Sequence, residues 1–209
     1  MSPLYRGGVR ITGGFWLLIA WFALVNGWKM LVTVLCAAAV HECGHLAVLR
    51  WNRAKIMGLR ISVFGAELET DSGSLSYGGE LAAVLAGPAA NLLCASVLLL
   101  LGGRRFWILA GANLALCAFN LLPIRRLDGG RAFYLLVAWA AGPAAGEWAA
   151  RYLGAFSAAA LASCLVWLMW RSGGSLWLAP AACGLLASAL GDIAAPIPGK
   201  REKQAIFAK

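Results

Sequence analysis

Charged residues are scarce in this chain: 18 Lys and Arg and 9 Asp and Glu make up 13% of its 209 residues. They fall mostly between long apolar stretches, and 61% of all residues are hydrophobic. A soluble domain does not need so much apolar sequence, whereas a chain that crosses a bilayer several times does. The formal net charge of +9 is typical of Lys and Arg that face anionic lipid head groups, so we expect a lipid bilayer and no nucleic acid as partner.

Cysteine pairs and phosphate-binding loops are also missing. The six cysteines lie within apolar segments and form no CxxC pair, so we expect inert thiols rather than disulfides. The glycine pairs at 102–103 and 173–174 lack the P-loop pattern. We expect no cleavable signal peptide, because the first apolar run is followed closely by another.

Six apolar stretches predict membrane spans. They lie at Gly13–Val25, Trp28–Leu49, Leu81–Leu101, Phe106–Leu122, Leu153–Trp170 and Leu176–Leu190. A short helix at the membrane interface is expected over Arg131–Gly142, where Gly142-Pro143 ends it. The predicted fold class is therefore an all-α polytopic membrane protein, with a single domain over residues 1–192 and a flexible cytosolic tail over 193–209.

Lys and Arg gather before the first span and after the second, fourth and sixth spans. In a six-span layout these four places lie on one side of the membrane, so both termini are predicted to be cytoplasmic. Arg104, Arg105 and Arg171 are exceptions to this bias. The histidines at 41 and 45 would then lie within the bilayer but nearer the cytosol.

The chain has only two histidines, and both belong to the sequence HECGH at residues 41–45, inside the apolar stretch Leu31–Leu49. Positions i and i+4 share one helix face, so His41 and His45 can bind one metal ion with Glu42 beside it. H-E-x-x-H on a helix is the zinc-binding pattern of metalloproteases, in which the glutamate is the general base. Ionisable groups within a span are costly and usually functional. The alternative is a chance match among polar helix-packing residues.

Two histidines leave a tetrahedral zinc short of one protein ligand, which must come from Asp, Glu or Cys. Asp128 is the best candidate, because Pro123 and the glycines at 129–130 indicate unwound backbone at the cytosolic end of the fourth span. The alternative is that these residues only end a helix and that Asp128 is solvated.

The segment between the second and third spans predicts a short β-hairpin. Residues 60–64 and 66–70 flank Gly65, and acidic residues alternate with less polar ones in the second arm. Its edge could hold an extended substrate by strand addition. A plain solvated loop is the alternative. Glu67, Glu69 and Asp71 are the rivals of Asp128 as third metal ligand.

The pattern N-x-x-P-x-x-x-x-D-G at residues 120–129, taken together with HECGH, resembles the site-2 protease family of intramembrane zinc metalloproteases. The similar region runs from Trp28 to Arg131. The resemblance implies that His41, His45 and Asp128 bind one Zn2+ per chain and that the glutamate between the histidines is catalytic.

Residues 87–91, GPAAN, also resemble a motif that the family places near the metal. The resemblance implies a catalytic role for Asn91, as a hydrogen-bond donor to the substrate or to the developing oxyanion. The alternative is a helix-packing site of small residues with a polar bond between helices.

Within that family, the compact six-span layout is similar to the sporulation branch, whose members process a precursor sigma factor at a developing spore membrane. The resemblance implies a membrane-associated protein substrate, regulatory membrane proteins as partners, and a bacterial cell membrane, including the one around a forespore. Many members carry a C-terminal nucleotide-binding CBS domain. Residues 193–209 are too few for one, so we expect no direct control by ATP.

A metal-binding transporter and a non-proteolytic membrane scaffold are the alternatives to a protease. A transporter would not need a glutamate directly after the first histidine, and the broken, repeated helices typical of transporters are missing. A scaffold would tolerate the loss of Glu42. Both histidines are needed for metal, so no serine or cysteine has a base. We therefore predict a zinc-dependent intramembrane metalloendopeptidase.

Overall fold

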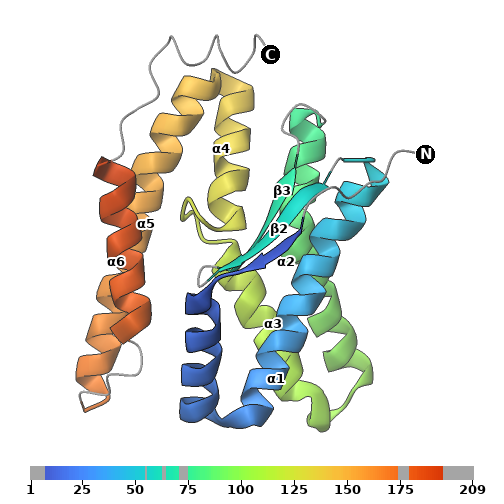
Figure 1. The fold of residues 1–209 in the computed structure, drawn as a ribbon, viewed down its shortest axis with the longest axis vertical. Helices are drawn as coiled ribbons and strands as arrows, with labels where there is room; N and C mark the ends of the chain where they lie inside the picture. The colour runs from blue at the N-terminus through green and yellow to red at the C-terminus, as the bar shows by residue number, and fades with distance from the viewer. Residues whose placement is uncertain (1–7, 55, 63–64, 71–74, 174–178, 195–209) are drawn as a thin grey trace.

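The computed structural model describes residues 8–54, 56–62, 65–70, 75–173 and 179–194. Helices dominate it, and a small sheet lies beside them (Figure 1). The strands are β1 (Val9–Ile11), β2 (Ile56–Ser62) and β3 (Gly65–Thr70). The helices are α1 (Gly13–Trp51), α2 (Tyr77–Leu101), α3 (Trp107–Asn120), α4 (Asp128–Ala141), α5 (Pro143–Arg171) and α6 (Ala179–Ala194), with a 3-10 turn, η1 (Arg104–Phe106), before α3. This is the predicted all-α architecture with a hairpin between the second and third spans.

Helix α1 contains the first two predicted spans. Its helical geometry is interrupted at Gly27, where φ is 79° and ψ is 160°. Glycine adopts a positive φ without steric cost, so the chain can reverse there. Figure 1 shows the two arms of α1, residues 13–26 and 28–51, running in opposite directions. The second arm carries both histidines.

Two helices differ from their predicted course. Helix α4 was expected across the membrane interface over Arg131–Gly142, but it begins at Asp128 and stands along the bundle, continuing beyond the end of α3 (Figure 1). The reason is its buried face of small and apolar residues, which packs against α2 and α5. Helix α5 begins at Pro143 rather than Leu153, because proline suits the first turn of a helix.

Three helices among the described residues are long and apolar enough to cross a membrane, by length and composition: α1, α2 and α5. Helices α3 and α6 have 14 and 16 residues, fewer than the roughly 20 of a full span. The fifth and sixth helices form an antiparallel pair that joins the rest mainly through α4 (Figure 1). The predicted tail beyond residue 194 lies outside the described residues.

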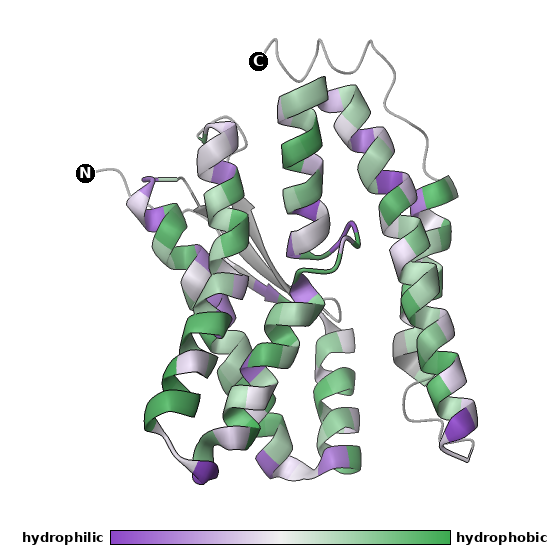
Figure 2. Cartoon of the chain, turned by 180° about the vertical axis from the view of Figure 1, so that it is seen from behind, coloured by the Kyte–Doolittle hydropathy of each residue, from purple (hydrophilic) through white to green (hydrophobic). Residues whose placement is uncertain are grey.

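Small side chains fill the spaces between these helices. Most of the buried hydrophobic residues are alanines, whereas large side chains such as Trp16 and Leu24 are 59% and 83% exposed. Figure 2 shows hydrophobic residues along most of each helix and hydrophilic ones near the helix ends, including the end of α3. Small interhelical residues let membrane helices approach closely, while large ones face lipid. Among the described residues, the buried polar side chains are His41, Asn91, Asn113, Arg151 and Ser188.

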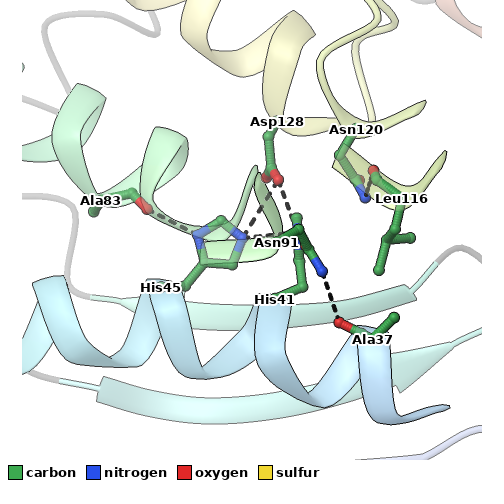
Figure 3. A network of polar contacts seen from close by, with 8 residues as sticks. All are labelled: Ala37, His41, His45, Ala83, Asn91, Leu116, Asn120 and Asp128. Atoms are coloured by element: carbon green, nitrogen blue, oxygen red, sulfur yellow. Dashed lines mark hydrogen bonds and ion pairs between the residues drawn. The ribbon is translucent and has the colours of Figure 1, made fainter. Parts of the chain in front are cut away.

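The predicted hairpin is confirmed and has a third strand. Strand β2 pairs with β3 in antiparallel register, with Leu59 opposite Leu68. Strand β1 pairs with the other edge of β2 in parallel, with Val9 opposite Leu59. Only three residues long, β1 gives too short a pattern to be predicted. The sheet lies next to the second arm of α1, beside the histidines (Figure 3).

Candidate metal centre

His41 and His45 project from one face of the second arm of α1. Their Nε2 atoms are 3.1 Å apart, and their rings meet edge to face with centroids separated by 4.7 Å. His41 is only 5% exposed. The spacing of four residues on a helix produces this pairing, as expected from the sequence.

Asp128 reaches the two imidazoles from the first turn of α4. Its Oδ2 atom lies 2.9 Å from His41 Nε2 and 3.4 Å from His45 Nε2 (Figure 3). The three residues form the group of potential metal ligands found among the described residues. The structure therefore brings together the three residues that the sequence proposed as ligands, from two segments that are distant in the chain.

The loop before α4 turns sharply to bring Asp128 into place. Backbone hydrogen bonds link Ile124 N to Leu122 O and Leu127 N to Ile124 O, at 2.7 and 2.8 Å. The glycines that follow allow this path. A Cβ on Gly129 would lie 2.2 Å from Leu121 O, and one on Gly130 would lie 2.2 Å from Ile124 O. The start of α4 thus packs directly on the loop backbone, which any side chain at those positions would prevent.

The hydrogen bonds at the Nδ1 atoms fix which ring nitrogen of each histidine is protonated. His45 Nδ1 lies 2.8 Å from the carbonyl oxygen of Ala83, which can only accept, so this nitrogen must donate. His41 Nδ1 lies 2.7 Å from Asn91 Oδ1, and it donates in the same way. Both Nε2 atoms of the neutral rings therefore present lone pairs toward Asp128.

When both rings are neutral and protonated at Nδ1, the centre between these atoms has no proton donor. Two imidazole lone pairs and a carboxylate oxygen converge, and among the described residues Asp128 Oδ2 is buried without a hydrogen-bond partner. Its short distances to the histidines count as ion pairs only when an imidazole is protonated. A cation at the centre would remove the repulsion between the carboxylate oxygen and the two imidazole lone pairs. The ligand atoms of a tetrahedral zinc are about 3.3 Å apart, because Zn–N and Zn–O distances are about 2.0–2.1 Å. The three distances between the ligand atoms here, 2.9–3.4 Å, fit such a zinc ion.

Gly87 forms the wall behind the imidazoles. A Cβ at this position would lie 2.3 Å from His45 Nε2 and 2.8 Å from His41 Cε1. Glycine also leaves the helix surface open, so that the His45 ring can reach the Ala83 carbonyl one turn earlier. The sequence identified residues 87–91 as a motif, but this reason for the glycine became visible only in the structure.

Glu42 lies beside the ligands on α1 and is half-buried. Its carboxylate interacts electrostatically with His45, His41 and Asp128. It is not one of the converging ligand atoms. This position suits a group that acts on a molecule held at the centre, and the general-base role stays a prediction.

Asn91 does not face an open space. Its Nδ2 donates to Ala37 O at 2.9 Å and to Asn113 Oδ1 at 2.8 Å (Figure 3 shows the first of these). Its Oδ1 accepts from His41, and the residue is 0% exposed. Both amide hydrogens are already used, so the predicted contact with an oxyanion would require the amide to leave these partners.

Five other polar residues were candidates for the site or belong to its surroundings. Asn113 on α3, also 0% exposed, was missed, although an asparagine within an apolar span is itself a signal. Asn120 donates to Leu116 O in its own helix at 3.0 Å (Figure 3). Of the rival ligands, Glu67 and Glu69 lie on β3, and Asp71 lies outside the described residues.

Known proteins resemble this chain in sequence and in fold. No family model matches the chain. Stage IV sporulation protein FB of Bacillus subtilis is 28% identical over 135 residues, covering 61% of this chain and 47% of that protein. The chain thus spans about half the length of this curated relative. Among solved structures, the Site-2 Protease from Methanocaldococcus jannaschii is similar with a TM-score of 0.63 and 20% identity, over 92% of this chain and 93% of that chain.

The chain has the site-2 protease fold. The sequence similarity to the sporulation protein adds to this, and the two findings together support an assignment to the site-2 protease family. With three helices able to cross a bilayer, they also support an integral membrane protein.

Proposed function

We propose that the chain is an intramembrane metalloendopeptidase that holds one zinc ion with His41, His45 and Asp128. One observation carries the proposal: two imidazole Nε2 atoms and one carboxylate oxygen converge within 2.9–3.4 Å of one another. Two imidazoles and one carboxylate favour zinc over magnesium or calcium, which prefer oxygen ligands. Three protein ligands also leave a fourth position open, as in catalytic zinc sites.

Zinc in such a site polarises a carbonyl and makes a water molecule more acidic. The residues of the chain supply the rest of the reaction. Glu42 accepts the proton of the attacking water and passes it to the amine that leaves when the peptide bond breaks. His41 and His45 keep their Nδ1–H groups bonded to oxygen, so their Nε2 atoms stay directed at the centre. The substrate must arrive as extended backbone, because a helix engages its own amides.

A membrane-associated protein is the substrate class that fits a site within apolar helices. The finer proposal is a precursor sigma factor processed during sporulation at a cell membrane or forespore membrane. It is supported by similarity to a relative named for stage IV of sporulation. We further propose that both termini face the cytoplasm and that membrane partners control access to the site.

The test compares the purified parental chain with two variants in detergent or liposomes, using candidate membrane-associated precursors first found by co-expression. Glu42→Gln should keep zinc, because no ligand changes, and should lose nearly all cleavage. His45→Ala should lose both zinc and cleavage. Ser96→Ala is the matched control: the exposed hydroxyl of Ser96 donates to Leu92 O in its own helix, 2.9 Å away, so the variant should behave as the parent.

Cleavage by Glu42→Gln at a near-parental rate would refute the general-base role. Zinc binding without cleavage of any precursor, accompanied by zinc movement across liposomes, would favour a transporter instead. Metal content that survives Asp128→Ala but falls in Glu67→Gln or Glu69→Gln would move the third ligand to the hairpin.

A further inference from the structure

We propose that Asn113 is a positioning residue for the metal centre, acting through Asn91 to fix the protonated nitrogen of His41. The inference deepens the proposed function, on which it rests, by naming residues that prepare one ligand for metal. Asn113 touches neither the centre nor a substrate. It lies on α3 and forms a hydrogen bond with Asn91 on α2, which in turn forms one with His41 on α1.

Burial shows that these two amides are not incidental. Asn91 and Asn113 are each 0% exposed and are the largest fully buried side chains among the described residues. They lie between apolar helices, where burying an amide without hydrogen-bond partners is costly. Such groups persist when every polar atom has a defined partner.

The direction of each amide follows from the carbonyl at the far end. Asn113 Nδ2 lies 2.9 Å from Leu109 O, which can only accept, so the oxygen of Asn113 must point the other way. That oxygen lies 2.8 Å from the Asn91 side chain. Asn91 must therefore present its nitrogen to it.

A second carbonyl agrees with the first. The same Asn91 nitrogen lies 2.9 Å from Ala37 O, which again requires a donor. The oxygen of Asn91 is left facing His41 Nδ1 at 2.7 Å. This nitrogen must then carry the hydrogen, so Nε2 keeps its lone pair for the centre. Turning either amide over would place oxygen against oxygen.

His45 provides the contrast that makes the proposal testable. Its Nδ1 bonds to the backbone oxygen of Ala83, which no substitution of a side chain removes. The state of His45 should be independent of Asn113, whereas that of His41 should not. Since the chain has only two histidines, an imidazole spectrum contains one test signal and one internal reference.

Two substitutions of Asn113 separate hydrogen bonding from packing. Asn113→Leu is similar in size but cannot accept from Asn91, so Asn91 keeps one carbonyl partner and turns more freely. Asn113→Asp, held neutral by its apolar surroundings, retains a carbonyl for Asn91 and an O–H for Leu109 O. Cys117→Ala is the packing control, because Cys117 is buried one turn further along the same helix and is 6% exposed.

The experiment uses the full chain in detergent, labelled with 15N in its histidine rings and free of metal, at a pH that keeps both rings neutral. The parent should show both rings protonated at Nδ1. In Asn113→Leu the ring of His41 should become a mixture of the two protonated forms, while His45 stays protonated at Nδ1. Asn113→Asp and Cys117→Ala should match the parent.

Zinc affinity, measured by competition with a chelator, is the second readout. Loss of a residue that orients a ligand typically costs about 10–100-fold in metal affinity, so we expect a loss of that order for Asn113→Leu. The absorption spectrum of bound Co2+ should change in the same variant. Asn113→Asp should restore both properties to near-parental values.

If His41 in the parent is protonated at Nε2, the proposal is wrong. This result needs no variant, so it applies even if Asn113→Leu does not fold. Equal losses in Asn113→Leu, Asn113→Asp and Cys117→Ala would also overturn it, since only packing would then matter. A parent that binds zinc but cleaves nothing would refute the protease and leave this inference standing. A parent that binds no metal would refute both.

Discussion

The histidine side of the site, built from α1 and α2, and the aspartate side, built from residues 121–127 and α4, hold their ligands by different means. Hydrogen bonds hold the histidines. Each Nδ1 is bonded to an oxygen on α2, at 2.7 and 2.8 Å. These bonds use the ring nitrogens that point away from the centre, so this side does not need the metal to orient its ligands.

Backbone packing holds the aspartate instead. The side chain of Asp128 is 20% exposed, and among the described residues its Oδ2 has no hydrogen-bond partner. The two glycines that follow it press α4 against the preceding loop. Two ion pairs tie this side to its neighbours: Arg131 with Glu80 on α2, and Arg125 with Glu147 on α5.

The difference implies that the two sides should fail separately. Changes in the loop or at the start of α4 should remove the third ligand and leave the imidazoles correctly protonated. Changes on α2 should disturb the imidazoles and leave Asp128 where it is. Zinc affinity reports on both sides, whereas histidine protonation reports on one.

The largest effect is expected at the glycines after Asp128. In Gly129→Ala or Gly130→Ala the new Cβ would meet a backbone oxygen at 2.2 Å, and backbone yields less than a flexible side chain. The first turn of α4 must move, so zinc binding and cleavage should both be lost. His41 and His45 should both remain protonated at Nδ1, as the 15N spectrum of their rings would show.

The matched control is Gly111→Ala, since a Cβ there meets nothing within 4 Å. It should be neutral or stabilising by up to about 1 kcal/mol, because alanine favours a helix over glycine. Parental zinc affinity in Gly130→Ala would show that the aspartate side tolerates a shifted α4, and that backbone packing does not hold Asp128 in place.

The next largest effect is expected from Gly87→Ala, which attacks the histidine side. Its Cβ would lie 2.3 Å from His45 Nε2, so the imidazoles must rotate away from Asp128. Overpacking of this kind costs about 1–3 kcal/mol, and most of that loss should appear in zinc affinity. The signals of both histidines should change, in contrast to the variants at Gly129 and Gly130. Unchanged signals with weaker zinc binding would contradict this assignment.

The sequence was sufficient for the parts of the site that depend on local spacing. Two histidines four residues apart define a shared helix face, and a proline followed by two glycines indicates unwound backbone near Asp128. The hairpin followed from alternation around Gly65. Each of these features is a short-range consequence of residue type.

What the sequence did not predict depends on contacts between distant segments. The course of α4 depends on a buried face that packs on α2 and α5. The roles of Asn91 and Asn113 depend on carbonyls of Ala37 and Leu109, which no side-chain pattern reveals. Strand β1 exists because β2 offers it a free edge. The sequence alone does not specify which distant segments make these contacts.

A smaller effect, on substrate rather than metal, is expected from the sheet. Strand β3 is an outer strand of the described sheet, so its outward amides are available to an extended substrate. Successive N–H groups point in opposite directions, so of Glu67→Pro and Leu68→Pro one removes an outward donor and the other a bond to β2. The outward one should raise KM by about 2- to 13-fold, the equivalent of one hydrogen bond, with zinc affinity unchanged.

Glu67→Gln is the control for this strand, because it changes a charge and leaves the backbone intact. It should have little effect on KM. If neither proline variant alters cleavage, the strand has no part in holding substrate. If either proline variant lowers zinc affinity, the sheet also supports the metal ligands and is a third region that holds them in place.

The smallest effect is expected at the ion pair between Arg131 and Glu80, which joins α4 to α2 at 2.6 Å. The two side chains are 50% and 30% exposed, so solvent and salt screen the pair, and exposed pairs contribute only about 0.2–1 kcal/mol. Arg131→Gln and Glu80→Gln, alone and together, should each change zinc affinity less than about fivefold. Their coupling should fade as salt rises. A coupling several times larger, insensitive to salt, would mean that this ion pair rather than glycine packing fixes Asp128, and the aspartate side would then depend on polar partners as the histidine side does.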